Sequence, residues 1–248
     1  MNLDLDLSVN IGILLAGGIS SRFNLVSSEN KISKQLYILD DKPLINYSID
    51  AFLELEDVNI NLNYLLIIVN SEIKEEIEKI IEKETKIIII VLVNDFNDRL
   101  ESINTGLQYI NDYIYDFNPF KINIIIHDSA RPFITQKHLK TLIDFNQTKI
   151  NNKNIVYSQY CMKLTNGLMN LENNEVLDRN KYLELCSPIC IDFKICYDIF
   201  ENCMKKDENN QREFYEFIPV LNILNLEYKL VEGHLKDLRK ITTREDIF

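Results

Sequence analysis

Four short runs dominated by branched apolar residues recur along the chain. They are residues 11–15 (IGILL), 64–69 (YLLIIV), 87–93 (IIIIVLV) and 122–126 (INIII). A strand with one solvated face alternates apolar and polar residues, so continuous runs predict strands buried on both faces, as in parallel sheets. Helical patterns lie between them, at 44–55, 71–81 and 101–115. This alternation predicts an α/β fold with a mostly parallel central sheet.

Two local signals refine this prediction. Ser71 precedes a run with Ile73, Ile77 and Ile80 on one helical face, which predicts Ser71 as an N-cap. The dipeptide Asn166-Gly167 suits a type I′ turn and predicts a protruding hairpin arm at about 158–178. A helix near 193–205 and a strand at 227–233 complete the pattern. Because no long linker or internal repeat interrupts it, we expect one domain spanning 1–248.

Charge and cysteine content exclude several classes of protein. The chain has 248 residues and 38 acidic against 27 basic side chains, a net charge of −11. Such a balance argues against a general binder of nucleic acid or of anionic membranes. The five cysteines form no C-x-x-C pair, no apolar run reaches the ~18 residues of a membrane span, and the first ten residues lack a signal pattern. We therefore expect a cytosolic protein.

The strongest functional signal follows the first predicted strand. It reads Leu14-Leu15-Ala16-Gly17-Gly18-Ile19-Ser20-Ser21-Arg22-Phe23. Adjacent glycines let backbone N–H groups approach an anion, and an arginine beyond them can balance its charge. Neither a G-x-G-x-x-G nor a Walker motif is present. The segment is thus a candidate nucleotide site, with an ordinary glycine turn as the alternative.

Further motifs follow in a fixed order. Lys34-Gln35 lies twelve residues after Arg22, and the later motifs are Arg99 with Ser102 and Gly106-Leu107, His127-Asp128-Ser129-Ala130-Arg131-Pro132, and Lys240-Ile241-Thr242. In this order, over about residues 11–246, the chain resembles the cytidylyltransferases that act on sugar-alcohol phosphates. The resemblance implies a Rossmann-like nucleotidyltransferase fold with a small β-arm.

The resemblance also implies roles for single residues. A phosphate oxygen of the polyol phosphate would attack the α-phosphorus of CTP and displace pyrophosphate, with Mg²⁺ bound to the triphosphate. The catalytic cations would be Arg22, Lys34 and Lys240. The CTP site would comprise Ala16, Gly17, Gly18, Ser20, Arg99, Ser102 and Asp128, and Asp128 is also a candidate metal ligand. The polyol phosphate would be bound by Arg131, Arg179, Ser187 and Lys240.

Each of these residues also has a structural interpretation. Asp128 could cap a helix, Arg131 could brace the turn before a proline, and Arg99 and Lys240 could be ordinary surface residues. The segment Asp178-Arg179 resembles one from which an arginine reaches the partner subunit's substrate. The resemblance therefore implies a homodimer joined by the arm.

Departures from the family pattern fall on the polyol side. Tyr160-Cys161-Met162-Lys163 replaces an Asp-Thr-Ile-Lys segment of the methylerythritol enzymes, and Ser187-Pro188-Ile189 replaces Thr-Pro-Gln. Ser33 replaces a proline, and the loop 24–32 is longer. The stretch 237–242 resembles the eukaryotic CDP-ribitol enzyme. We therefore predict D-ribitol 5-phosphate as the acceptor, with 2-C-methyl-D-erythritol 4-phosphate as the alternative.

Other functions remain open at this point. A guanylyl- or uridylyltransferase shares the glycine loop, although Lys34-Gln35 and the His-Asp-x-x-Arg-Pro run disfavour it. A catalytically silent binding or regulatory homologue is a further alternative, because the departures concern the acceptor. Intact Arg22, Lys34, Asp128 and Lys240 favour an enzyme over such a homologue.

Overall fold

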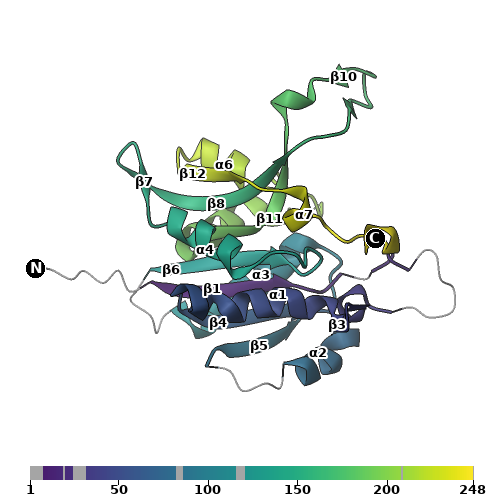
Figure 1. Cartoon of the computed structure of the whole chain (residues 1–248). Coiled ribbons are helices and arrows are strands. Elements are labelled where there is room, and N and C mark those ends of the chain that lie inside the picture. The colour runs from purple at the N-terminus through teal and green to yellow at the C-terminus, as the bar shows by residue number, and fades with distance from the viewer. Residues whose placement is uncertain are drawn as a thin grey trace, which may run out of the picture.

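The computed structural model describes residues 8–18, 20–24, 32–81, 86–115, 121–207 and 209–247. One large twisted sheet runs through the molecule in the order β12-β8-β11-β6-β1-β4-β5, with β7 beside β8 (Figure 1). Two short strand pairs, β2 with β3 and β9 with β10, lie outside it. Residues 25–31 of the predicted longer loop and the first seven residues lie outside the described residues.

The sheet is mostly parallel, as predicted. β1 pairs in parallel with both β4 and β6, and β4 with β5. β11 is antiparallel to its neighbours β6 and β8, whereas β12 is parallel to β8. Parallel strands end at the same edge, so the carboxyl ends of β1 and β6 meet where ligands bind in open α/β sheets.

The strands begin and end as follows: β1 Val9–Leu15, β2 Ile38–Leu39, β3 Lys42–Pro43, β4 Leu62–Val69, β5 Ile88–Val93, β6 Ile122–Asp128, β7 Lys149–Ile150, β8 Lys153–Lys163, β9 Leu168–Met169, β10 Val176–Leu177, β11 Leu183–Asp192 and β12 Glu227–Glu232. The α-helices are α1 Leu44–Leu53, α2 Lys74–Ile80, α3 Arg99–Tyr113, α4 Gln136–Phe145, α5 Phe193–Ile199, α6 Phe217–Ile223 and α7 Leu235–Leu238.

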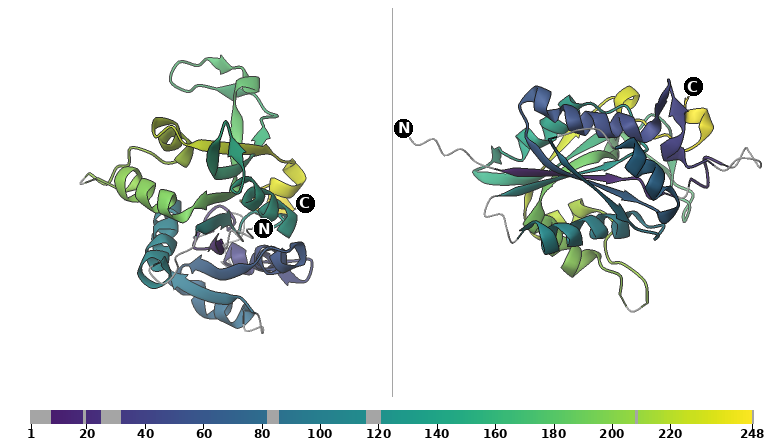
Figure 2. Two further views of the ribbon diagram at one scale, coloured as in Figure 1. Left: turned by 90° about the vertical axis from the view of Figure 1, so that its left-hand side faces the viewer. Right: turned by 90° about the horizontal axis from the view of Figure 1, so that it is seen from below.

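Helices cover both faces of the sheet (Figure 2). The core on one face takes side chains from α3, α5 and α6, and the core on the other takes them from α1, α2 and α4. This arrangement explains the continuous apolar runs, since every side chain of β6 is buried. Within the described residues, no helix is long and apolar enough to cross a membrane.

The arm differs in detail from the sequence prediction. The chain leaves the sheet after β8 and returns at β11, and in between β9 pairs with β10 in antiparallel register. Neither Asn166 nor Gly167 has the positive φ that a type I′ turn requires. The link between the paired strands is residues 170–175, where the Asn170 N–H donates to the Glu175 carbonyl at 2.8 Å. The predicted turn is therefore misplaced.

Two further predictions need correction. Ser71 begins a 3-10 turn, and its backbone N–H donates to Asp95 Oδ1 at 2.7 Å, so it does not cap α2. β5 is not buried on both faces, because it is an edge strand that pairs only with β4 among the described strands. Ile88 and Val93 at its ends are exposed for that reason.

Candidate active site

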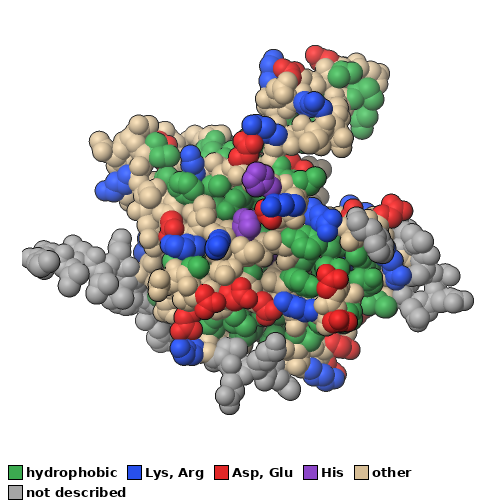
Figure 3. Space-filling view, viewed as in Figure 1, with side chains coloured by type: hydrophobic (Ala, Val, Ile, Leu, Met, Phe, Trp, Pro, Cys, Tyr) green, Lys and Arg blue, Asp and Glu red, His purple; other side chains and the backbone are tan. Residues whose placement is uncertain are grey.

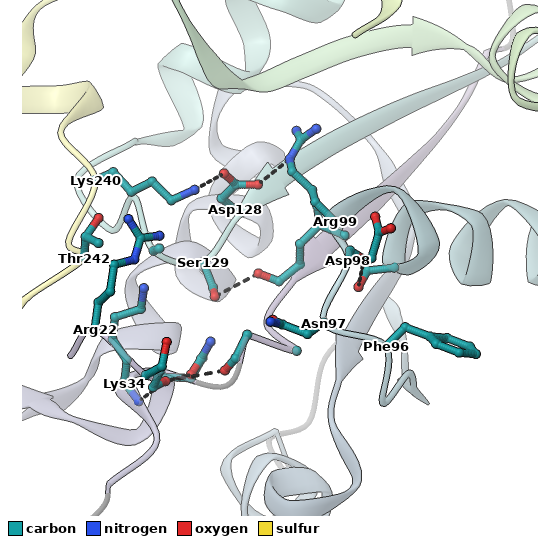
Figure 4. A pocket seen from close by; sticks show the side chains of 18 residues that line it. Arg22, Lys34, Phe96, Asn97, Asp98, Arg99, Asp128, Ser129, Lys240 and Thr242 are labelled. Carbon is teal, nitrogen blue, oxygen red and sulfur yellow. Dashed lines mark hydrogen bonds and ion pairs between the residues drawn. The ribbon is translucent and has the colours of Figure 1, made fainter. Parts of the chain in front are cut away.

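A cavity of about 450 Å³ lies at the edge of the sheet where β1 and β6 end (Figure 4). The cavity is lined by the loop after β1, the turn with Lys34 and Gln35, the residues from Phe96 to the start of α3, the end of β6 and the C-terminal segment around Lys240. Arg22, Lys34 and Lys240 lie on one side of the cavity, and Phe96 lies on the opposite side. The cavity thus has a cationic end, where Arg22, Lys34 and Lys240 gather, and an opposite end beside Phe96.

The glycine loop turns directly after β1. A Cβ on Gly17 would lie 3.4 Å from the Asn94 carbonyl oxygen, so the loop passes close to backbone there. Ser20 takes the left-handed conformation, with φ of 54°. Its Oγ accepts the backbone N–H of Lys34 at 2.9 Å, which ties the two phosphate-side motifs together. Ser20 therefore holds the loop closed over the start of the Lys34 turn.

Lys34 projects toward the C-terminal segment, where its Nζ donates to the Ile241 carbonyl at 2.9 Å. Burial, together with the charges of Lys240 and Arg22, lowers the pKa of Lys34 from 10.5 to about 8, although Asp128 acts in the opposite direction. For Arg22, no side-chain hydrogen bond or ion pair occurs among the described residues. Lys34 and Arg22 are therefore available to an anion.

Asp128 lies at the centre of the cavity wall and meets a cation on each oxygen. Arg99 Nε donates to Oδ1 at 3.1 Å, and Lys240 Nζ donates to Oδ2 at 3.0 Å. Burial would raise the pKa of this carboxyl, but Arg99 and Lys240 outweigh burial and hold it far below the usual range. Asp128 does not cap a helix, because it is the last residue of β6. Its position supports the functional interpretation.

The C-terminal segment is fixed at both ends of its approach to the cavity. The Ile241 N–H donates to the Ala130 carbonyl at 2.8 Å. Asp246 Oδ2 accepts the N–H groups of Thr242 and Thr243, both at 2.7 Å. These bonds place Lys240 and Thr242 in the cavity wall, although they lie more than one hundred residues from the other lining residues.

The start of α3 forms the end of the cavity opposite Arg22, Lys34 and Lys240. Asp98 caps the helix through Oδ1, which accepts the Leu100 N–H at 2.9 Å. Ser102 Oγ donates to the Asp98 carbonyl at 3.2 Å, and Asn94 Oδ1 accepts the Phe96 N–H at 2.9 Å. Arg99 and Ser102 both line the cavity, so the predicted cytosine-side residues do lie at one end of it.

Four predicted residues lie elsewhere than in the cavity lining. The Ala16 side chain is buried in the core, and Ser187 lies behind Asp128, whose N–H its Oγ accepts at 3.1 Å. The buried guanidinium of Arg131 donates to the Leu238 carbonyl, which agrees with the turn-bracing alternative. Arg179 lies on the exposed arm and donates to the Thr165 carbonyl. Within a single chain, Arg131 and Arg179 thus reach no shared ligand site.

Several lining residues were not predicted. Asp98 and Ser129 each adjoin a predicted residue in sequence, and Thr242 lies two residues after Lys240. Ser129 and Thr242 fell within motifs, whereas Asp98 did not. Gln35 was quoted within a motif, and its Oε1 accepts the Ser33 hydroxyl at 2.7 Å. Phe96 is 67% exposed at the cavity wall and gave no sequence signal, because an isolated aromatic residue in a loop resembles any other.

The described residues contain no group of three His, Cys, Asp or Glu side chains that could hold a metal alone. Asp128 is the carboxylate that faces the cationic end, since Asp98 is engaged with α3. Mg²⁺ commonly takes one or two protein carboxylates and completes its shell with substrate phosphates and water. The donor set therefore fits a nucleotide-borne Mg²⁺ with Asp128 as its protein ligand, and does not fit a metal cage.

Comparison with known proteins agrees with this geometry. The family described as IspD, 2-C-methyl-D-erythritol 4-phosphate cytidylyltransferase, matches residues 11–248. The 2-C-methyl-D-erythritol 4-phosphate cytidylyltransferase of Thermosipho melanesiensis is 27% identical over 243 residues, covering 97% of this chain and 95% of that protein. The protein of the same name from Clostridium kluyveri is 24% identical over 243 residues, covering 96% and 93%.

Solved structures confirm the predicted fold class. The 4-diphosphocytidyl-2C-methyl-D-erythritol synthase structure from Anaerococcus prevotii matches with a TM-score of 0.72 at 16% identity, covering 97% of this chain and 95% of that one. The bifunctional IspDF from Campylobacter jejuni matches with a TM-score of 0.67 at 21% identity, covering 96% of this chain and 53% of that one.

The predicted acceptor, D-ribitol 5-phosphate, is wrong. The family match and the relatives all carry the methylerythritol description instead. The ribitol prediction depended partly on the segment Tyr160-Cys161-Met162-Lys163, of which Lys163 is exposed and Tyr160, Cys161 and Met162 are buried in β8. Their departure from the family pattern therefore reflects core packing and gives no information on the acceptor.

Proposed function

Because the chain belongs to the IspD family of 2-C-methyl-D-erythritol 4-phosphate cytidylyltransferases and is therefore a nucleotidyltransferase, we propose that it transfers the cytidylyl group of CTP to 2-C-methyl-D-erythritol 4-phosphate. The observation that carries the proposal is the convergence of Arg22, Lys34 and Lys240 on one end of a cavity that α3 closes at the other. A triphosphate suits the cationic end, and a neutral base suits the end formed by Ser102 and nearby backbone.

The chemistry needs little beyond position and charge. An oxygen of the acceptor phosphate forms a bond to the α-phosphorus of CTP while the bond to the bridging oxygen breaks, and pyrophosphate leaves. The attacking oxygen is already ionised, so no protein base is required. Charge that builds on the phosphoryl oxygens is met by Arg22 and Lys34, which stabilise the transition state more than the bound substrate.

We include Mg²⁺ in the proposal, with Asp128 as its protein ligand and the triphosphate supplying further oxygens. When bound, the ion would neutralise phosphate charge and favour departure of pyrophosphate. In the free protein, Asp128 also accepts Arg99 on one carboxylate oxygen and Lys240 on the other. Both cations therefore stay at the cavity wall, Arg99 at the start of α3 and Lys240 on the side of Arg22 and Lys34.

A homodimer belongs to the same proposal. The arm carries apolar side chains that are exposed in one chain (Figure 3): Met169 is 54% exposed, Leu171 84% and Val176 75%. Such a patch on a projecting arm is expected to be covered by another protein surface. A second copy of the chain would also bring its arm, and with it Arg179, toward an acceptor phosphate.

The test is to incubate the purified protein with CTP and Mg²⁺ and to follow pyrophosphate release. We expect release with 2-C-methyl-D-erythritol 4-phosphate and little with D-ribitol 5-phosphate as the matched control acceptor. Removal of Mg²⁺ with a chelator should stop the reaction, and added Mg²⁺ should restore it. Absence of release with 2-C-methyl-D-erythritol 4-phosphate, at concentrations where the Thermosipho melanesiensis protein turns over, would contradict the proposal and favour a silent homologue.

A further inference from the structure

Arg212 is a buried arginine that the proposed reaction does not use. It lies in the segment between α5 and α6, and its side chain is only 4% exposed. Its Nε donates to the Met204 carbonyl at 2.8 Å, so its own segment fixes the guanidinium in place. A buried arginine must be paired on all sides to offset its desolvation.

The remaining guanidinium nitrogens meet the first turn of α3. Nη1 donates to Asp98 Oδ2 and Nη2 to Glu101 Oε1, both at 2.5 Å. Lys206 Nζ lies 3.3 Å from the same Asp98 oxygen but is 29% exposed. Burial opposes ionisation of Asp98, but hydrogen bonds from Arg212 and from the Leu100 N–H outweigh it, so the pKa of this carboxyl is lowered. Arg212 is therefore matched to two ionised carboxylates.

The two carboxylate oxygens of Asp98 have different partners. Oδ1 caps α3, whereas Oδ2 receives Arg212. Loss of Arg212 would therefore leave the helix cap in place and remove the buried contacts that attach the first turn of α3 to the segment after α5. The more exposed Lys206 also pairs with this turn, at 3.3 Å from Asp98 Oδ2 and 3.7 Å from Glu101 Oε1, and two turns further along α3 Gln108 Nε2 donates to Glu201 Oε1 at 3.1 Å.

We infer that Arg212 is a positioning residue for nucleotide binding, which acts through Asp98 on the first turn of α3. That turn carries Asp98, Arg99 and Ser102, and all three line the cavity. Displacing it moves the end of the cavity proposed for the base, and leaves the phosphate end formed by Arg22 and Lys34 untouched. The inference rests on the proposed function, since it assigns the base of CTP to that end.

The test compares Arg212→Met, Arg212→Lys and the control Lys205→Met. Lys205 lies in the same segment and pairs with Glu201 Oε2 at 2.5 Å, whereas Gln108 of α3 donates to the other oxygen, Glu201 Oε1, so the substitution leaves that contact in place. We expect Arg212→Met to raise KM for CTP by roughly tenfold, because misplaced binding groups lose much of their effect, while KM for the acceptor stays within about twofold. Arg212→Lys keeps the charge but not the fork, so its effect should be intermediate. Lys205→Met should match the wild type.

Two outcomes would overturn the inference. One is a rise in KM for CTP with Arg212→Met that is no larger than with Lys205→Met, and the other is an equal rise in KM for both substrates. Arg212→Met and Ser102→Ala can also be combined in a double-mutant cycle. Their effects on KM for CTP should be less than additive if both act on the same turn.

Hydrogen exchange separates this inference from the proposed function. In the free protein, Arg212→Met should speed exchange of the Ser102 and Ile103 amides while those of β1 stay protected. Unchanged exchange in α3 overturns the role of Arg212 whatever the activity. Faster exchange in a protein that releases no pyrophosphate supports the attachment of α3 and counts against the proposed function alone.

Discussion

At the scale of single residues, the surroundings of Lys34 in the site lower its pKa. Its Nζ lies beside the positive charges of Lys240 and Arg22, and burial removes part of its hydration. Both effects disfavour the ammonium form, which is why its pKa falls to about 8. A triphosphate would reverse this balance, because an anion favours the charged lysine. In the free site, Lys34 is thus a cation whose pKa a bound anionic substrate would raise.

The pH dependence of turnover should follow from this lysine. The kcat/KM for CTP should be flat near pH 7 and fall as pH rises through about 8, because Lys34 then loses its proton in the free protein. Lys34→Arg should shift this fall to higher pH, since a guanidinium stays charged above pH ~12. Lys34→Ala should cut turnover at least ~tenfold. Steady-state kinetics between pH 6.5 and 9.5, chosen as roughly the range that brackets the pKa, measures it.

Unfolding provides the control for that experiment. Because the unfolded chain keeps this lysine protonated up to about pH 10.5, the unfolded state binds more protons than the folded state between pH 8 and 10.5. The contribution of Lys34 to the free energy of unfolding should therefore rise with pH in this window. A fall in activity that tracks a fall in the melting temperature, or an identical fall in Lys34→Arg, would count against the assignment.

At the scale of elements, the C-terminal segment delivers two lining residues without belonging to any long helix or strand. Backbone bonds to Ala130 and the Asp246 carboxylate hold it in place. Asp246 is the element's key contact, because its Oδ2 accepts three donors from Thr242 and Thr243. The buried core residues here are Leu238 and Ile241, and Ile247 packs, partly buried, against the same cluster as Ile241.

Asp246→Ala should therefore lower activity more than stability. We expect kcat/KM to fall by about tenfold because Lys240 and Thr242 lose their fixed position, whereas the melting temperature should drop by only a few degrees. Asp246→Asn keeps an acceptor oxygen and should retain much of the activity. Thermal unfolding and steady-state kinetics on both variants measure it, and equal losses in the two variants would show that the negative charge matters instead of the hydrogen bonds.

The elements also show which features the sequence could reveal. Residues 122–126 predict a buried strand because apolar residues dominate the run, with Asn123 as its one polar position, and Asp128 at its end follows from that placement. The segment around Lys240 was found only by resemblance, because its position depends on bonds to Ala130, Lys34 and Asp246 that no local pattern encodes. Arg212 was missed for the same reason: its partners Asp98 and Glu101 lie more than one hundred residues away.

At the scale of the whole molecule, the arm is the part whose apolar side chains a single chain leaves exposed. It stands clear of the body in Figure 1 and carries exposed apolar side chains. The rest of the described chain already closes its two cores around the sheet. The proposed second copy would bury this patch and complete the acceptor side of the site.

Changing Leu171 and Val176 together to Asp should make the protein monomeric and strongly reduce turnover, because two charges in an apolar interface are costly. The matched control is Ile223→Asp, since Ile223 on α6 is 69% exposed but far from the arm in sequence. Sedimentation velocity and pyrophosphate release measure the two effects. A wild-type protein that is monomeric and active at the same concentration would contradict this prediction.

The strand β11, which runs antiparallel to both β6 and β8, has a consequence for how such a protein can change during evolution. A link between two parallel strands must cross back to the opposite edge, so its length is tied to the sheet it spans. The link from β8 to β11 leaves and re-enters the sheet at the same edge, which is the edge with the cavity. Insertions or deletions there can alter how far the molecule reaches beyond its own catalytic edge without shifting the register of any strand. Partner choice can therefore diverge in this family while the chemistry of the cavity stays the same.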